Sequence, residues 1–116
     1  MPAKNPRLYL IHICECCERI LDYTGGIESM WPGVPVVHDA VCRNLEIIGE
    51  AARRFDDTFR SAHAEIPWRA MTDVRNILIH AYDQVAAEIL VDIVRKDIPP
   101  LLASVKSILD EEALSG

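Results

Sequence analysis

Apolar residues recur every three or four positions over most of the chain, which is the spacing of an amphipathic α-helix. In a first predicted helix, about Asn5 to Tyr23, Asn5 is a typical N-cap, Pro6 suits the first helical position and Thr24-Gly25-Gly26 ends the pattern. Its apolar face consists of Leu10, Ile13, Cys17, Ile20 and Leu21. A second predicted helix, about Val36 to Phe55, has an apolar stripe of Leu45, Ile48, Ala52 and Phe55.

Three further helices are predicted, and they are about Trp68 to Tyr82, Ala86 to Lys96 and Leu101 to Ala113, with Pro99-Pro100 separating the last two. In the second helix, Gly49-Glu50-Ala51-Ala52 puts small residues where another backbone can approach closely. No strand-like alternation or internal repeat occurs. The pattern therefore predicts an all-α fold, an up-and-down bundle of about five helices, in a single domain over residues 1–116.

Composition and charge narrow the functional class. The net charge of −6 argues against a broad electrostatic contact with nucleic acid, although basic residues concentrated in one cleft could still bind it. No apolar run approaches the roughly 20 residues that span a bilayer. The segment before Leu8 leads directly into a helix and is not a secretory signal, so we expect a cytoplasmic protein.

The cysteines offer little chemistry. Cys14, Cys16 and Cys17 fall in one turn of a predicted helix and cannot easily bridge each other, so reduced thiols are expected. Cys14 and Cys17 form a C-x-x-C and His12 with Cys16 an i,i+4 pair, but no second ligand pair follows. We therefore predict no metal site and interpret these residues as small core or interface residues.

The third predicted helix carries the candidate chemistry. Its core face is Met71, Val74, Leu78 and Ala81. Asn76 and His80 lie one turn apart on the polar side, and Arg75 lies at the margin of the apolar stripe. Arg75 and His80 differ by about 140° in azimuth and roughly 7.5 Å in rise. A joint site therefore needs the arginine to wrap around the helix, a distorted helix end, or a second protomer.

These residue types suit the cleavage of RNA, whose ribose 2′-OH is a built-in nucleophile. Histidine transfers protons near neutral pH, and arginine offers a fixed charge and a planar fork for phosphate oxygens. Asn76 could orient the imidazole or hold a phosphate oxygen. The spacing alone also fits ordinary polar residues on an amphipathic helix.

Several segments resemble one known family. Arg75-Asn76-Ile77-Leu78-Ile79-His80-Ala81-Tyr82 resembles the Arg-x4-His-x-Tyr signature of HepT-like toxins in the HEPN superfamily. Residues 39–51 resemble that family's second helix, Ile66-Pro67-Trp68 its entry to the motif helix and residues 97–101 the start of its last helix. The resemblance extends over about residues 7–109.

The resemblance implies a HEPN-like homodimer and an endoribonuclease toxin that needs no metal or other cofactor. Its catalytic residues would be Arg75 and His80, with Asn76 supporting them. Its partner would be a minimal nucleotidyltransferase antitoxin of the MntA type, with which it could form a larger hetero-oligomer. This antitoxin would transfer AMP from ATP to the hydroxyl of Tyr82. The added phosphates beside Arg75 would block the cleft and repel RNA.

Two alternatives stay open at this point. The chain could be a non-catalytic helical dimer that binds and regulates a nucleotidyltransferase or a nucleotide, and the acidic charge favours this hypothesis. The other open question concerns three arginines of the second predicted helix, which are Arg43, Arg53 and Arg54. They could line an RNA groove, or they could form a solvated face paired with Glu46 and Glu50. The solvated face is favoured. His38 and His63 are expected to be surface or capping residues, and Trp31 and Trp68 packing anchors.

Overall fold

The structure is a computed structural model that describes residues 5–25 and 33–115, without the side chains of residues 82 and 112–115. Its α-helices are α1 (Pro6–Thr24), α2 (Pro35–Ala52), α3 (Asp57–Ala62), α4 (Trp68–Ala81), α5 (Ala87–Asp92) and α6 (Ile98–Ser115). A 3₁₀ turn, η2 (Tyr82–Gln84), follows α4, and a π-helical turn, η3 (Ile93–Asp97), joins α5 to α6. No strand occurs in the described ranges, so the all-α prediction is confirmed.

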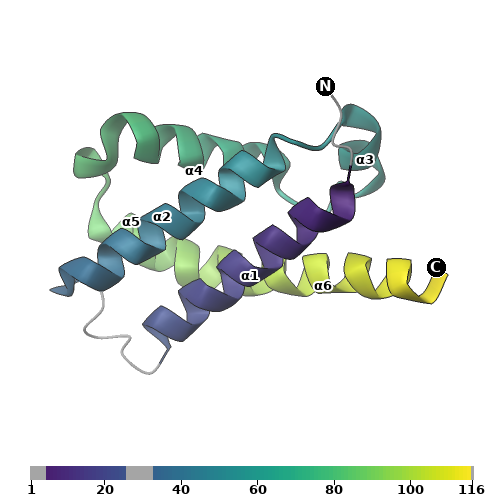
Figure 1. Cartoon of the computed structure of the whole chain (residues 1–116). Helices are drawn as coiled ribbons and strands as arrows, with labels where there is room; N and C mark the ends of the chain where they lie inside the picture. The colour runs from purple at the N-terminus through teal and green to yellow at the C-terminus, as the bar shows by residue number, and fades with distance from the viewer. Residues whose placement is uncertain (1–4, 26–32, 116) are drawn as a thin grey trace.

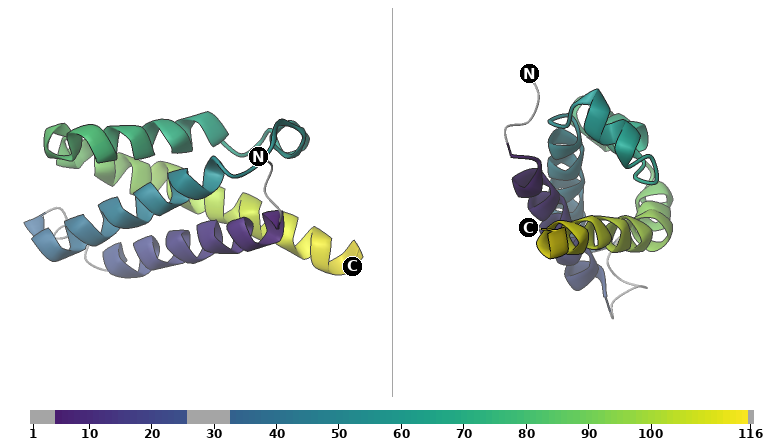
Figure 2. Two further views of the ribbon diagram at one scale, coloured as in Figure 1. Left: turned by 45° about the horizontal axis from the view of Figure 1, so that its top comes forward. Right: turned by 90° about the vertical axis from the view of Figure 1, so that its right-hand side faces the viewer.

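The long helices follow one another in alternating directions, and α1 and α2 are inclined to α4 and α6 (Figures 1 and 2). α2 contacts α1 on one side and α4 on the other, and α6 packs against α1. α3 closes one end of the bundle, near the start of α1 (Figure 1). Within the described part of the chain, no helix is long and apolar enough to cross a membrane.

The first helix forms as the sequence predicts. The Asn5 side chain accepts a hydrogen bond from the Leu8 N–H at 3.2 Å, and α1 ends at Thr24 with Gly25 as its C-cap. Its core face is Leu10, Ile13, Cys16, Cys17 and Ile20, each at most 1% exposed. Trp31 lies outside the described residues.

The predicted end of the second helix is wrong. α2 stops at Ala52, and the chain turns so that Phe55, 2% exposed, enters the core from outside the helix. The Phe55 ring lies 4.9 Å, centroid to centroid, from the rings of Phe59 and Trp68. Aromatic packing therefore overrides the helical spacing that included Phe55 in α2. The prediction for Trp68 is confirmed, since it is a buried anchor.

Helix α3 was not predicted from the sequence. It begins where the Asp56 carboxylate accepts a hydrogen bond from the Phe59 N–H at 2.9 Å. This is an ordinary N-cap, and it starts a short helix in a segment where none is predicted from the sequence. Tertiary packing of Phe59 against Phe55 then holds the helix in place.

The predicted break at Pro99-Pro100 is also wrong. The Ile98 N–H bonds to the Ile93 carbonyl, five residues back, so the chain continues from α5 through η3 into α6 without a loop. The two prolines fall in the first turn of α6, where a missing N–H costs little because the π-turn has already changed the bonding pattern.

Candidate functional site

The site begins where α2 and α4 cross at Gly49. A Cβ built on Gly49 would lie 2.6 Å from the Met71 carbonyl oxygen and closer still to the Cβ of Arg75. Only glycine allows this approach, which confirms the prediction that small residues in the second helix mark a close backbone neighbour. The contact places Glu50, the next residue of α2, beside Arg75 of α4.

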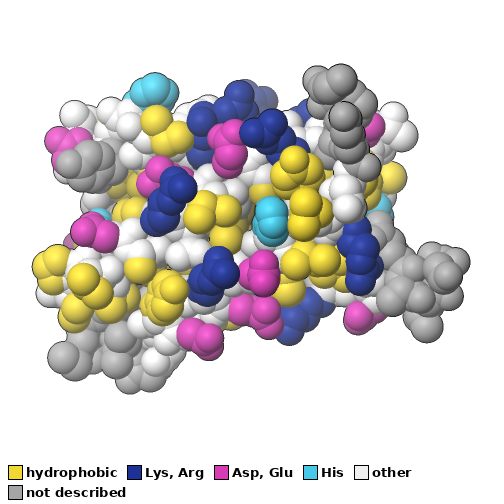
Figure 3. All heavy atoms as spheres, viewed as in Figure 1, with side chains coloured by type: hydrophobic (Ala, Val, Ile, Leu, Met, Phe, Trp, Pro, Cys, Tyr) yellow, Lys and Arg dark blue, Asp and Glu magenta, His cyan; other side chains and the backbone are white. Residues whose placement is uncertain are grey.

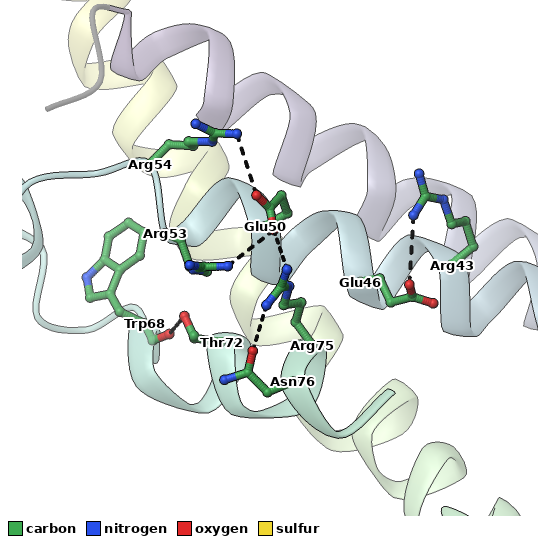
Figure 4. A network of polar contacts seen from close by, with 9 residues as sticks. All are labelled: Arg43, Glu46, Glu50, Arg53, Arg54, Trp68, Thr72, Arg75 and Asn76. Carbon is green, nitrogen blue, oxygen red and sulfur yellow. Dashed lines mark hydrogen bonds and ion pairs between the residues drawn. The ribbon is translucent and has the colours of Figure 1, made fainter. Parts of the chain in front are cut away.

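Arg75 is held by two partners. Its Nη2 lies 3.1 Å from Oε2 of Glu50, and its Nη1 donates to Oδ1 of Asn76 at 2.8 Å (Figure 4). The side chain is only 20% exposed, and its Nε is buried without a hydrogen-bond partner. The guanidinium is therefore held in place through both of its terminal nitrogens.

Glu50 also gathers two other arginines. Its carboxylate lies 3.6 Å from Arg53 and 3.5 Å from Arg54, in addition to Arg75 (Figure 4). Three guanidinium groups thus share one carboxylate, which leaves this spot positive on a chain of net charge −6. Figure 3 shows Lys and Arg side chains gathered over the α2–α4 edge of this face.

Arg75 opens onto a groove of ≈ 440 Å³ between α1, α2 and α4. The residues lining it are Tyr9, His12, Arg43, Glu46, Ile47, Glu50, Ala51, Arg54, Arg75 and Ile79. Arg43 pairs with Glu46 at 3.8 Å. The preference for arginines paired with Glu46 and Glu50 is therefore confirmed, and two of these arginines line the groove as well.

His80 lies apart from Arg75. It is exposed in the last turn of α4, does not line the groove, and makes no hydrogen bond or ion pair within the described residues. Arg75 turns toward α2 and does not wrap around α4. Of the three arrangements that could form a joint site, the one in which Arg75 wraps around its own helix is therefore not observed. Tyr82 begins the 3₁₀ turn after α4, and its side chain lies outside the described part.

Comparison with known proteins supplies the family. Residues 13–108 match the family described as "Ribonuclease HepT-like". The chain belongs to this family. No solved structure matches it.

Named relatives of the HepT-like chain come from a bacterium and from archaea. It is 39% identical over 110 residues to "Putative RNase TTE0752" of Caldanaerobacter subterraneus subsp. tengcongensis, with 94% of this chain and 98% of the relative covered. It is 33% identical to "Putative RNase MJ1380" of Methanocaldococcus jannaschii, covering 91% and 98%. It is 50% identical over 62 residues to "Probable ribonuclease HepT" of Thermococcus cleftensis, covering 53% and 56%. Membership thus supports a ribonuclease.

The cysteines of this HepT-like chain form no disulfide, as predicted, and all four are free. Burial raises the pKa of each thiol, and that of Cys17 reaches about 12. Neutral thiols are poor nucleophiles and poor metal ligands, so packing explains these residues. Among the described residues, no group of three or more His, Cys, Asp or Glu side chains is arranged to hold a metal ion.

Two features of the site were missed from the sequence. Glu50 was expected to pair with the arginines of its own helix and to act as a supporting or dimer-contact residue, but its ion pair with Arg75 was not predicted, although its position next to a glycine at a helix crossing is a usable signal. Tyr9 had no assigned role, and His12 was considered only with Cys16. Their place in the groove depends on the packing of α1 against α2, which the periodicity of either helix alone does not determine.

Proposed function

We propose that the chain is a metal-independent endoribonuclease whose reaction uses Arg75 and His80, with Asn76 and Glu50 as positioning residues. The observation that carries this proposal is the fixed guanidinium of Arg75, which lies on a groove and in a locally positive spot of an acidic protein. Such a group matches the two oxygens of a phosphodiester.

The chemistry requires a proton acceptor, a proton donor and positive charge. The ribose 2′-oxygen attacks the adjacent phosphorus as its proton leaves, and the 5′-oxygen of the next nucleotide takes up a proton as its bond to phosphorus breaks. The exposed imidazole of His80 suits one of these transfers. Arg75 stabilises the charge that builds up on the phosphate oxygens.

A homodimer completes the proposed site. Because Arg75 turns toward α2 while His80 projects from the end of α4, one chain offers the two groups in different directions. A twofold axis beside the end of α4 would bring His80 of each protomer toward the cleft of the other. Ile77, which is 52% exposed, lies on the same helix and would be covered in such a contact.

The regulation we propose follows the family resemblance. A nucleotidyltransferase antitoxin of the MntA type would attach AMP to Tyr82, which follows Arg75 by seven residues. The added phosphates would compete with RNA for Arg75. An intact mass of the co-expressed pair, raised by whole AMP units that map to Tyr82, tests this part.

Cleavage of a labelled RNA in excess EDTA tests the activity. We expect His80→Ala to lower the rate by about 10²- to 10⁴-fold, and Arg75→Lys to lower it strongly because an ammonium cannot replace the planar fork. His63→Ala is the matched control, since His63 caps α3 outside the groove. Activity that survives His80→Ala in a folded dimer would refute the assignment. Absence of cleavage by the wild type, with tight binding to a nucleotidyltransferase, would favour the non-catalytic alternative.

A further inference from the structure

The groove beside Arg75 has an aromatic wall that the proposed chemistry does not use. Tyr9 and His12 project into it from α1, both half-buried. The Tyr9 ring meets the buried Phe55 ring edge-on, with centroids 6.2 Å apart. The His12 ring stands at 88° to that of Tyr9, with centroids 6.0 Å apart. Because Tyr9 packs against the buried Phe55, the rings of Tyr9 and His12 are held as two perpendicular aromatic surfaces.

Two arginines line the same groove, Arg43 from α2 and Arg54 from the turn that follows it. They are 70% and 56% exposed, and their nitrogens lie 3.8 Å from Glu46 and 3.5 Å from Glu50 respectively. Ion pairs this exposed are weak, so phosphate can replace the carboxylate at little cost. Nine residues of α2, a rise of about 14 Å, separate Arg43 from the helix end at Ala52, and Arg54 follows two residues later. A single strand of RNA that contacts both arginines would therefore span more than one nucleotide.

We propose that this groove is a nucleotide-binding subsite for single-stranded RNA, in which a base lies against His12 and Tyr9 and the backbone follows Arg43 and Arg54. The inference rests on the proposed function, because Arg75 lines the same groove and so places this nucleotide next to the scissile phosphate. Single strands fit because only an unstacked base can lie against an aromatic wall. Ile47, Ala51 and Ile79 supply an apolar lining for the base.

Binding is measured on the dimer that carries His80→Ala, so that RNA is bound and not cut. A fluorescently labelled single-stranded RNA is titrated in EDTA at several salt concentrations and followed by anisotropy. Adding His12→Ala should raise Kd about tenfold, as expected for the loss of one base stacking contact. Adding His63→Ala should leave Kd unchanged. Adding Arg43→Gln should reduce the slope of log K against log salt by about 0.7.

A single abasic nucleotide moved along the RNA separates stacking from indirect effects. At one position, next to the cleavage site, the abasic RNA should bind the His12→Ala protein and its parent equally. A His12→Ala effect that persists at every abasic position would overturn the subsite. An unchanged Kd for His12→Ala would also overturn the subsite. If His12→Ala in that case lost binding of a labelled oligoglutamate peptide, the groove would belong to a protein partner.

The two proposals fail separately. If wild-type protein cuts RNA and His12→Ala changes neither Kd nor KM, the subsite is wrong and the proposed activity stands. If wild-type protein cuts no RNA, the proposed activity is wrong, and the binding and abasic measurements still decide the subsite.

Discussion

Replacing Gly49 with alanine should separate α2 from α4 and displace Arg75. The new methyl group would meet the Met71 carbonyl oxygen at 2.6 Å and the Cβ of Arg75 at a shorter distance. Neither neighbour can rotate away, because one is backbone and the other is attached to it. Relief therefore requires one helix to move as a body.

The expected loss of stability follows from two opposed effects. Overpacking of a core contact typically costs about 1–3 kcal/mol of stability. Because neither neighbour can move aside, we expect the added methyl group of Gly49→Ala to cost ~3 kcal/mol. Alanine in a helix interior recovers about 1 kcal/mol relative to glycine. The net loss is about 2 kcal/mol, and at ~4 °C per kcal/mol for a domain of this size the Tm falls by about 8 °C.

Thermal unfolding of Gly49→Ala is compared with that of Gly33→Ala. A Cβ at Gly33 contacts nothing within 4 Å, so this control should be neutral or stabilising by up to about 1 kcal/mol. RNA cleavage, measured at a temperature where both variants are folded, should fall only in Gly49→Ala. A Tm within about 1 °C of wild type would refute the close crossing of α2 and α4.

Three further predictions concern other parts of the chain. Glu50→Gln should tighten RNA binding about threefold at low salt, because the arginines lose their shared counter-charge. It should also lower kcat, because Arg75 loses its anchor. An unchanged Kd and kcat would show that the contact between Glu50 and Arg75 has no functional role. Asp56→Ala should lower the free energy of unfolding by about 1 kcal/mol in urea titrations, since it removes the cap of α3. The pKa of Cys17 is raised to about 12 from 9.0, so the folded state holds a proton that the unfolded state loses, and stability should fall as pH rises through that range. Cys17→Ala should flatten this decline in urea midpoints.

The sequence predicted the fold well where local signals agree with packing. Asn5 and Pro6 place the start of α1, and Trp68 follows a proline at the start of α4. The errors occur where a tertiary contact or an unusual turn overrides the local signal. Phe55 leaves the helix to join an aromatic cluster, and a π-turn carries the chain through Pro99.

The site was predicted only in part, for a geometrical reason. The azimuths of Arg75 and His80 follow from the helical repeat, so the sequence already indicates that one chain does not bring them together. The partner of Arg75 does not follow in this way, because it depends on which residue of α2 faces α4. Gly49 fixes that register, and Glu50 becomes the anchor as a result.

Charge distribution explains how an acidic chain can bind RNA at all. The net charge of −6 repels phosphate at long range, whereas the arginines around Glu50 attract it at contact distance. Salt screens interactions beyond about 10 Å more strongly than those within the groove. Added salt should therefore weaken the long-range repulsion more than the attraction within the groove, and the affinity should depend less on salt than it does for a basic RNA-binding protein with as many phosphate contacts. We therefore expect the proposed site to select RNA by the fit of a few nucleotides to one groove, because the overall charge of the protein gives no general affinity for nucleic acid.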